Sequence, residues 1–291
     1  MNQSTSIEMN PTPVDLGKPT IKERISQFPW WFVALILILV ATFVTIATQP
    51  SYTEAFMFIK AGLGITIRTT LISFAIALFL GLITGLGRIS HHVFIKNIAT
   101  LYVEFIRGVP MLVLIFFIAL VAVPASVGSL NDLGHWFQAQ GWSRIATPFL
   151  ALENKAIEMN VRAIIALSVT YGAFLAEIFR AGIQSVGKGQ MEAARSQGMS
   201  RSHAMIYIIL PQAIRNVLPA LGNDFVAMLK DSSLVSVLAV RDITQVARLY
   251  AGRSFRYEEA YTILAILYLS MTVVLSLVVK YIERRGRQDE H

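Results

Sequence analysis

The chain has 291 residues, of which 55% are hydrophobic and only 15% charged, with a formal net charge of +7 and no cysteine. An average soluble domain has about 25% charged residues, so this composition favours an integral membrane protein. The positive charge fits the Lys and Arg residues that collect in cytoplasmic loops, and no basic and aromatic pattern indicates nucleic-acid binding. The lack of cysteine excludes disulfides and cysteine-ligated metals.

The N-terminal region, residues 1–29, is expected to be a polar cytoplasmic tail followed by an interfacial segment that includes the charged stretch TIKERISQ. Residues 30–48 contain no charge, and a helix of this length can cross the hydrocarbon core of a bilayer. A signal peptide has a shorter apolar core and a small-residue cleavage site. We therefore predict a transmembrane helix over 30–48, with Trp30 and Trp31 as interfacial anchors.

Further apolar segments predict membrane-spanning helices at 63–87, 98–123, 161–183, 212–249 with an interruption, and 260–282. Together with 30–48 they predict an all-α polytopic membrane bundle of about six transmembrane helices. The stretch from Gly81 to Gly85 reads G-x-x-x-G, a pattern that permits close approach of helices. The same glycines equally fit the general frequency of glycine in membrane helices. Residues 124–160 are expected to form an extramembrane loop with short helices.

The distribution of basic residues predicts the orientation in the membrane. If the N-terminus is cytoplasmic, six spans return the C-terminus to the cytoplasm. The inner segments then contain Lys18, Lys22, Arg24, Arg88, Lys96, Lys188, Arg195, Arg201, Arg215, Lys280, Arg284, Arg285 and Arg287. One outer connection, 241–259, disagrees with the rule because it contains Arg241, Arg248, Arg253 and Arg256.

The cytoplasmic stretch AGIQSVGKGQMEAARSQGMS contains a near match to a phosphate-binding loop, G-x-x-x-x-G-K. A true loop of this kind follows a strand and continues with Ser or Thr, whereas this one follows an apolar helix and continues with Gly189. The sequence instead predicts a helix–turn–helix elbow over about 187–210. In it, Gly187 and Gly189 allow a sharp exit from the membrane helix, Gly198 caps the first short helix, and Ser200 caps the second.

This elbow resembles the EAA loop of ABC-transporter permease subunits, through EAARSQG followed by ILPQAIRNVLPAL. The stretches GLGITIRTTLIS, YVEFIRGVPMLVL, YGAFLAEIFRAG and LKDSSLVSVLAV are similar to the polar amino-acid uptake branch of that family. The resemblance covers about residues 60–285. The helix at 30–48 departs from the five-helix core of many such subunits, and residues 286–291 are expected to be a cytoplasmic tail.

The resemblance implies a permease subunit of a binding-protein-dependent importer in the bacterial inner membrane. Its partners would be ABC ATPase subunits, a second permease subunit, an extracytoplasmic amino-acid-binding protein, the surrounding lipid and a polar amino-acid substrate. ATP and magnesium would bind the ATPase, and this chain would bind no cofactor and perform no catalysis. The elbow would transmit motion to the ATPase through the residues that match the motif: Glu192, Ala193, Ala194 and Gly198.

Charged residues within the predicted spans are candidates for a substrate pathway, because charges in a bilayer must face protein or water. Two i, i+3 pairs, Glu104 with Arg107 and Glu177 with Arg180, fit either a structural or a pathway-lining role. The stretch NDFVAMLKDSSLVS predicts a broken helix, whose free backbone groups suit a zwitterionic ligand. Equally, one helix simply ends there and another begins. Its candidate residues are Asp224, Lys230, Asp231, Ser232 and Ser233.

Other function classes remain as alternatives: an ABC permease for another small solute, or a self-sufficient secondary transporter or channel. A membrane enzyme has little support, because neither H-E-x-x-H nor G-x-S-x-G occurs in the sequence. The neighbours His91 and His92 do not predict a metal site, because adjacent helical residues diverge by about 100°.

Overall fold

The computed structural model describes residues 30–288, and every regular element in this range is helical. The predictions for residues 1–29 lie outside the described residues. The chain divides into two compact units, Met1–Thr45 and Ile46–His291. Helix α2 (Trp30–Thr48) makes up the described part of the first unit and extends just into the second, with the bounds predicted for the N-terminal apolar helix.

The described chain contains helical segments long and apolar enough to cross a membrane at Pro50–Arg88, Met111–Ala139, Met159–Ser185, Arg201–Leu238 and Tyr257–Glu283. A shorter apolar helical stretch, Val33–Thr48, lies in α2. These segments make the chain a multi-pass membrane protein. The all-α class is therefore confirmed, and five of the predicted spans overlap these segments, although the span predicted at 98–123 is wrong in detail. The membrane span predicted at 30–48 stays a prediction.

That stretch contains two helices instead of one span: the amphipathic helix α5 (Val93–Gly108) and helix α6 (Met111–Phe117). Proline disfavours helical backbone in the residue before it, and Val109, before Pro110, has φ −113° and ψ 137°. The membrane-spanning segment therefore begins only at Met111. It continues through the π-helical turn Ile118–Ala122 into helix α7 (Val123–Ala139).

The region predicted as an extramembrane loop, 124–160, is also more regular than expected. Its first part belongs to α7, and helix α8 (Ser143–Leu150) folds back along α7. At the crossing, a Cβ on Gly134 would lie 2.9 Å from Cβ of Phe149, so only glycine permits this approach. The prediction of short helices therefore holds for α8, and the prediction of a loop fails for α7.

Helix α9 (Met159–Ser185) is the central element of the second unit, and it packs along helix α4 (Leu63–Arg88). The close approach depends on the G-x-x-x-G glycines of α4. A Cβ on Gly81 would lie 2.7 Å from Cβ of Leu175, and one on Gly85 would lie 2.9 Å from the carbonyl oxygen of Ala176. The interpretation of these glycines as a helix-packing site is therefore confirmed.

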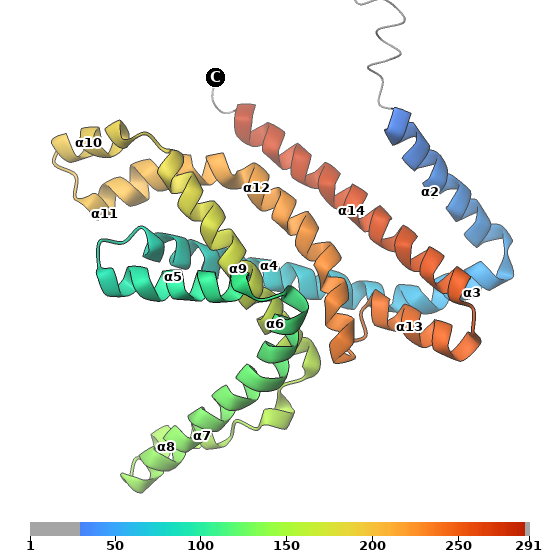
Figure 1. Cartoon of the computed structure of the whole chain (residues 1–291), viewed down its shortest axis with the longest axis horizontal. Coiled ribbons are helices and arrows are strands. Elements are labelled where there is room, and N and C mark those ends of the chain that lie inside the picture. The colour runs from blue at the N-terminus through green and yellow to red at the C-terminus, as the bar shows by residue number, and fades with distance from the viewer. Residues whose placement is uncertain (1–29, 289–291) are drawn as a thin grey trace, which may run out of the picture. The chain divides into compact units, whose positions relative to one another are not determined.

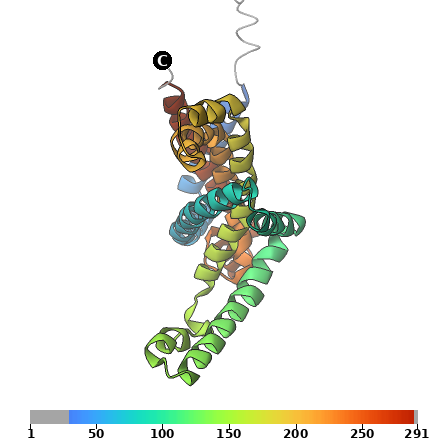
Figure 2. The ribbon, with the colours of Figure 1, turned by 90° about the vertical axis from the view of Figure 1, so that its left-hand side faces the viewer.

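The cytoplasmic elbow begins after α9 with helix α10 (Lys188–Ser196) and helix α11 (Arg201–Ala204). A π-helical turn, Met205–Ile209, leads into helix α12 (Leu210–Asp231), and a 3₁₀ segment, Ser232–Leu238, follows. The break predicted at Asp231–Ser233 is therefore present. Within the second unit, the elbow and the α7–α8 hairpin lie at opposite ends (Figures 1 and 2).

The chain then forms helix α13 (Ile243–Ser254) and the long helix α14 (Tyr257–Gln288), which lies beside α12 in Figure 1. Asp242 caps α13 by accepting a hydrogen bond from the Gln245 N–H at 2.9 Å, and burial raises the pKa of its carboxyl. Arg256 forms an ion pair of 2.7 Å with Glu54 on helix α3 (Pro50–Ile59). This contact neutralises one of the arginines that conflict with the positive-inside rule.

Candidate functional site: the elbow and a polar network of three helices

The elbow has a fixed geometry set by its caps. Gly198 has φ +85°, a left-handed conformation that ends the first helix, and its N–H donates to the carbonyl of Arg195 at 3.0 Å. The Ser200 hydroxyl accepts a hydrogen bond from the His203 N–H at 3.2 Å, which starts α11. The capping roles predicted for Gly198 and Ser200 are therefore confirmed.

The predicted role of Gly187 and Gly189 is wrong. Gly187 precedes the helix with φ −56°, an angle open to other residues, and Gly189 lies inside α10. Among the described residues, positive φ occurs only at Gly141, Gly198, Ala239 and Phe255. The chain leaves α9 through extended backbone at Val186, so the exit needs no left-handed residue.

The EAA residues are divided between the inside and the outside of the elbow. Ala194 is buried, whereas Glu192, Ala193 and Gly198 are exposed. The Arg195 guanidinium donates to the carbonyl of Met199 at 3.2 Å and ties α10 to the turn that follows it. The elbow therefore presents a carboxylate and small residues on its surface, while Ala194 allows close packing beneath them.

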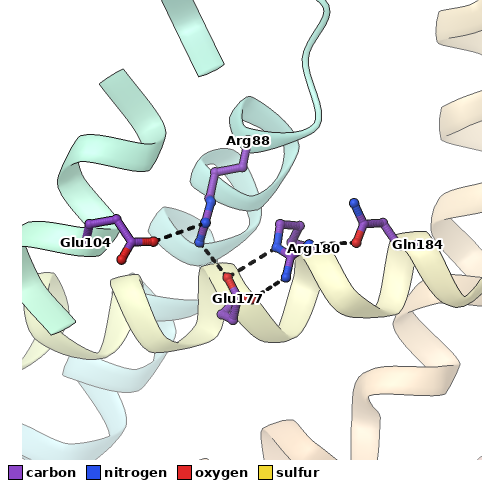
Figure 3. A network of polar contacts seen from close by, with 5 residues as sticks. All are labelled: Arg88, Glu104, Glu177, Arg180 and Gln184. Atoms are coloured by element: carbon purple, nitrogen blue, oxygen red, sulfur yellow. Dashed lines mark hydrogen bonds and ion pairs between the residues drawn. The ribbon is translucent and has the colours of Figure 1, made fainter. Parts of the chain in front are cut away.

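A network of charged side chains joins α4, α5 and α9 (Figure 3). Arg88, at the end of α4, donates to Glu177 on α9 at 2.5 Å and lies 3.4 Å from Glu104 on α5. Glu177 also pairs with Arg180, which donates to Gln184 at 2.6 Å. The network therefore joins three helices. Arg88, Glu177 and Arg180 are largely shielded from solvent, whereas Glu104 and Gln184 are exposed.

This arrangement confirms one of the two predicted pairs. Glu177 and Arg180 pair as expected from their spacing, whereas Glu104 forms its ion pair with Arg88, and Arg107 is exposed on α5. Nearby, the Tyr102 hydroxyl donates to the carbonyl of Val169 at 2.5 Å, and burial raises the pKa of this phenol to about 12. Tyr102 therefore fixes α5 against α9.

A second polar contact lies at the break after α12. The Tyr171 hydroxyl, on α9, donates to a carboxylate oxygen of Asp231 at 2.6 Å. Asp224 lies two helical turns before Asp231, on the same face of α12. Ser232 is buried and donates to the carbonyl of Leu229 at 2.7 Å, whereas Lys230 is exposed. Ser233 is half-buried on the 3₁₀ segment. The candidate pathway residues therefore lie in two separate places. Glu104 and Glu177 belong to the network around Arg88, and Asp224 and Asp231 lie near Tyr171.

The sequence does not predict the helix–helix contacts of Arg88, Tyr171 and Arg162. For Arg88, the one signal is its position at the end of an apolar helix. Tyr171 is a polar group in an otherwise apolar stretch. Arg162 is buried and donates to the carbonyls of Ala119, Asn154 and Ile157 and to the Asn154 side chain, so it holds the start of α9 against the π-helical turn.

Comparison with known proteins gives a consistent result. Residues 77–288 match the family described as binding-protein-dependent transport system inner membrane component. The probable glutamine ABC transporter permease protein GlnM of Bacillus subtilis is 37% identical over 220 residues, which are 76% of this chain and 89% of the relative. The glutamine transport system permease protein GlnP of Escherichia coli K12 is 33% identical, over 77% and 90%.

The fold is also similar to a solved structure, the crystal structure of an amino acid ABC transporter with histidines. The TM-score is 0.64 at 36% sequence identity, and the match covers 82% of this chain and 98% of the other. The family match begins at residue 77 and therefore lies within the second unit, which contains the elbow and the polar network.

Proposed function

This chain belongs to the family of binding-protein-dependent transport system inner membrane components, and we propose that it imports polar amino acids as the permease subunit of an ATP-driven transporter. The observation that carries the proposal is its similarity to glutamine and other amino-acid permeases over more than three quarters of its length. As a member of this family the chain is a transport subunit, and ATP hydrolysis takes place on a separate chain. We assign ATP and magnesium to that ATPase, and no cofactor to this chain.

The proposed assembly contains this chain, a second permease subunit, ABC ATPase subunits and an extracytoplasmic binding protein that delivers the amino acid. Glu192, Ala193, Ala194 and Gly198 would contact the ATPase. Two features support this assignment: the elbow is rigidly capped, and it presents an exposed carboxylate beside small residues. A conformational change of the ATPase can reach the membrane helices only through a contact that differs between the two states of the ATPase.

We also propose the bacterial inner membrane as the location, with both termini and the elbow in the cytoplasm. Because the chain has no cysteine, single cysteines can report this orientation directly. With a membrane-impermeant maleimide, Gln190→Cys on α10 should react only in permeabilised cells, and Gln138→Cys on α7 should react in intact cells. Both side chains are exposed. The reverse pattern would contradict the proposed orientation.

Transport itself is tested by reconstitution with the ATPase, the second permease and the binding protein in proteoliposomes. We expect uptake of glutamine or another polar amino acid that requires both ATP and the binding protein. Uptake by the permease alone, driven by an ion gradient, would contradict the proposal and support the secondary-transporter alternative. ATP-dependent uptake of another small solute, with no amino acid carried, would support the alternative of an ABC permease with a different substrate.

A further inference from the structure

A groove of about 810 Å³ lies between the turn that follows α4 and the elbow. Its floor is apolar and comes from the elbow ends of three candidate membrane spans, through Leu86 of α4, Ile183 of α9, and Ile206 and Ile209 before α12. Ile206 is 55% exposed, so the apolar surface continues to the outside of the elbow. In the orientation proposed above, these cytoplasmic ends of the spans would lie where a bilayer changes from hydrocarbon to headgroups.

The rim of the groove is basic. Lys188 at the start of α10 and Arg201 at the start of α11 line it from the elbow, and His91 and His92 line it from the turn after α4. All four side chains are exposed. None of the described residues that line the groove is Asp or Glu. The groove therefore combines an apolar floor with a positively charged rim.

We propose that this groove binds an anionic phospholipid of the cytoplasmic leaflet, with its phosphate against Lys188 and Arg201 and part of an acyl chain on the apolar floor. The proposal rests on the orientation proposed above. Basic residues at the cytoplasmic face of membrane proteins attract anionic headgroups. Because the groove joins the α4–α5 turn to α10, a bound lipid would make the position of the elbow dependent on the composition of the membrane.

The ATPase is the other candidate for this groove, and the geometry favours the lipid. The residues assigned to ATPase coupling, Glu192 and Gly198, do not line the groove. The floor consists of the ends of membrane-spanning segments, where a soluble subunit would meet the headgroup layer. Moreover, an anionic amphiphile matches both features of the groove at once, the apolar floor and the uncompensated basic rim.

The test uses the full chain in liposomes of phosphatidylcholine that contain one third phosphatidylglycerol, with a trace of either lipid that has a photoreactive diazirine on its acyl chain. After illumination, mass spectrometry locates the adducts. We expect the phosphatidylglycerol probe to label residues 86–92 and 205–209 more strongly than the phosphatidylcholine probe does. The double variant Lys188→Gln/Arg201→Gln should lower this preference by roughly thirtyfold, the factor expected for the loss of two basic residues.

Arg144→Gln/Lys155→Gln is the matched control, because it removes two exposed basic residues near the opposite end of the second unit. Ile206→Gln gives a second, charge-neutral test of the floor and should lower labelling by both probes. Equal labelling by the two probes, or an unchanged preference in Lys188→Gln/Arg201→Gln, would overturn the proposal. So would loss of the adducts when the ATPase binds. None of these readouts measures transport, so failure of the lipid proposal can be distinguished from failure of the proposed function. The cysteine assay tests the orientation independently.

Discussion

Arg88 and Glu177, 89 positions apart in the sequence, form an ion pair of 2.5 Å that joins the end of α4 to α9. The Arg88 side chain is only 13% exposed, so its charge depends on protein partners. Glu177 also accepts from Arg180, and one carboxylate therefore neutralises two guanidinium groups. This shared carboxylate adds an electrostatic link between α4 and α9 to the close packing of the two helices at Gly81 and Gly85.

We expect Glu177→Gln to lower the stability of the protein, because it leaves Arg88 and Arg180 without their common carboxylate. The loss should be about 1–3 kcal/mol, the range for unpairing a partly buried charge. Thermal unfolding of the purified protein in detergent measures it. Glu104→Gln is the matched control: Glu104 also pairs with Arg88 but is 63% exposed, so its loss should cost at most about 1 kcal/mol. Equal effects of the two variants would contradict this ranking.

The close contact of α4 with α9 predicts that Gly81 tolerates no side chain. Gly81→Ala places a Cβ 2.7 Å from Leu175 Cβ and 3.1 Å from the Leu175 backbone, so the helices must separate. We expect a loss of about 1–3 kcal/mol, measured as a lower midpoint of thermal unfolding. Gly64→Ala on the same helix meets no atom within 4 Å and should have little effect or be slightly stabilising. A stable Gly81→Ala protein would show that the helices can move apart at low cost.

The elbow offers a comparison in which only backbone strain differs. Neither Gly198 nor Gly189 has an atom within 4 Å of an added Cβ, but Gly198 has φ +85°. Gly198→Ala should cost about 1–2 kcal/mol locally and loosen the end of α10, whereas Gly189→Ala should favour the helix. We therefore expect Gly198→Ala, and more strongly Gly198→Val, to uncouple ATP hydrolysis from uptake at normal membrane abundance.

Reconstituted uptake and ATPase rates, measured on the same preparations, check this coupling. Gly189→Ala should retain the wild-type ratio of uptake to hydrolysis. Glu192→Lys changes the exposed carboxylate instead of the backbone and should also uncouple. Wild-type uptake by both Gly198→Val and Glu192→Lys would rule out the proposed role of the elbow.

The features that could be predicted from the sequence are those set by local chemistry. Apolar segments predicted the approximate positions of the spans, and the caps at Gly198 and Ser200 follow from the preferences of single residues. The span predicted at 98–123 failed because hydropathy alone does not register the break before Pro110. The ion pair of Arg88 with Glu177 could not be predicted, since it depends on how two distant helices pack. The spacing of Glu104 and Arg107 suggested a local pair, and the tertiary contact with Arg88 replaced it.

The contact of Tyr171 with Asp231 leads to a prediction about the substrate pathway. If Asp231 binds the substrate's ammonium group, Asp231→Asn should raise the substrate concentration needed for half-maximal ATPase stimulation. The increase should be roughly tenfold or more, because one charge-assisted contact is lost. Basal ATPase activity should be unchanged, and Glu153→Gln, an exposed carboxylate near the start of α9, should have no effect.

Tyr171→Phe distinguishes a role of Asp231 in substrate binding from a role in holding the helices together. It removes the 2.6 Å hydrogen bond and leaves the carboxylate charge in place, so Asp231 loses its orientation but not its attraction for a cation. We expect a smaller increase in the half-maximal substrate concentration than in Asp231→Asn, together with a modest fall in thermal stability. An unchanged substrate response in Asp231→Asn would remove Asp231 from the pathway. In that case the Tyr171 contact would serve only to hold the break after α12 against α9.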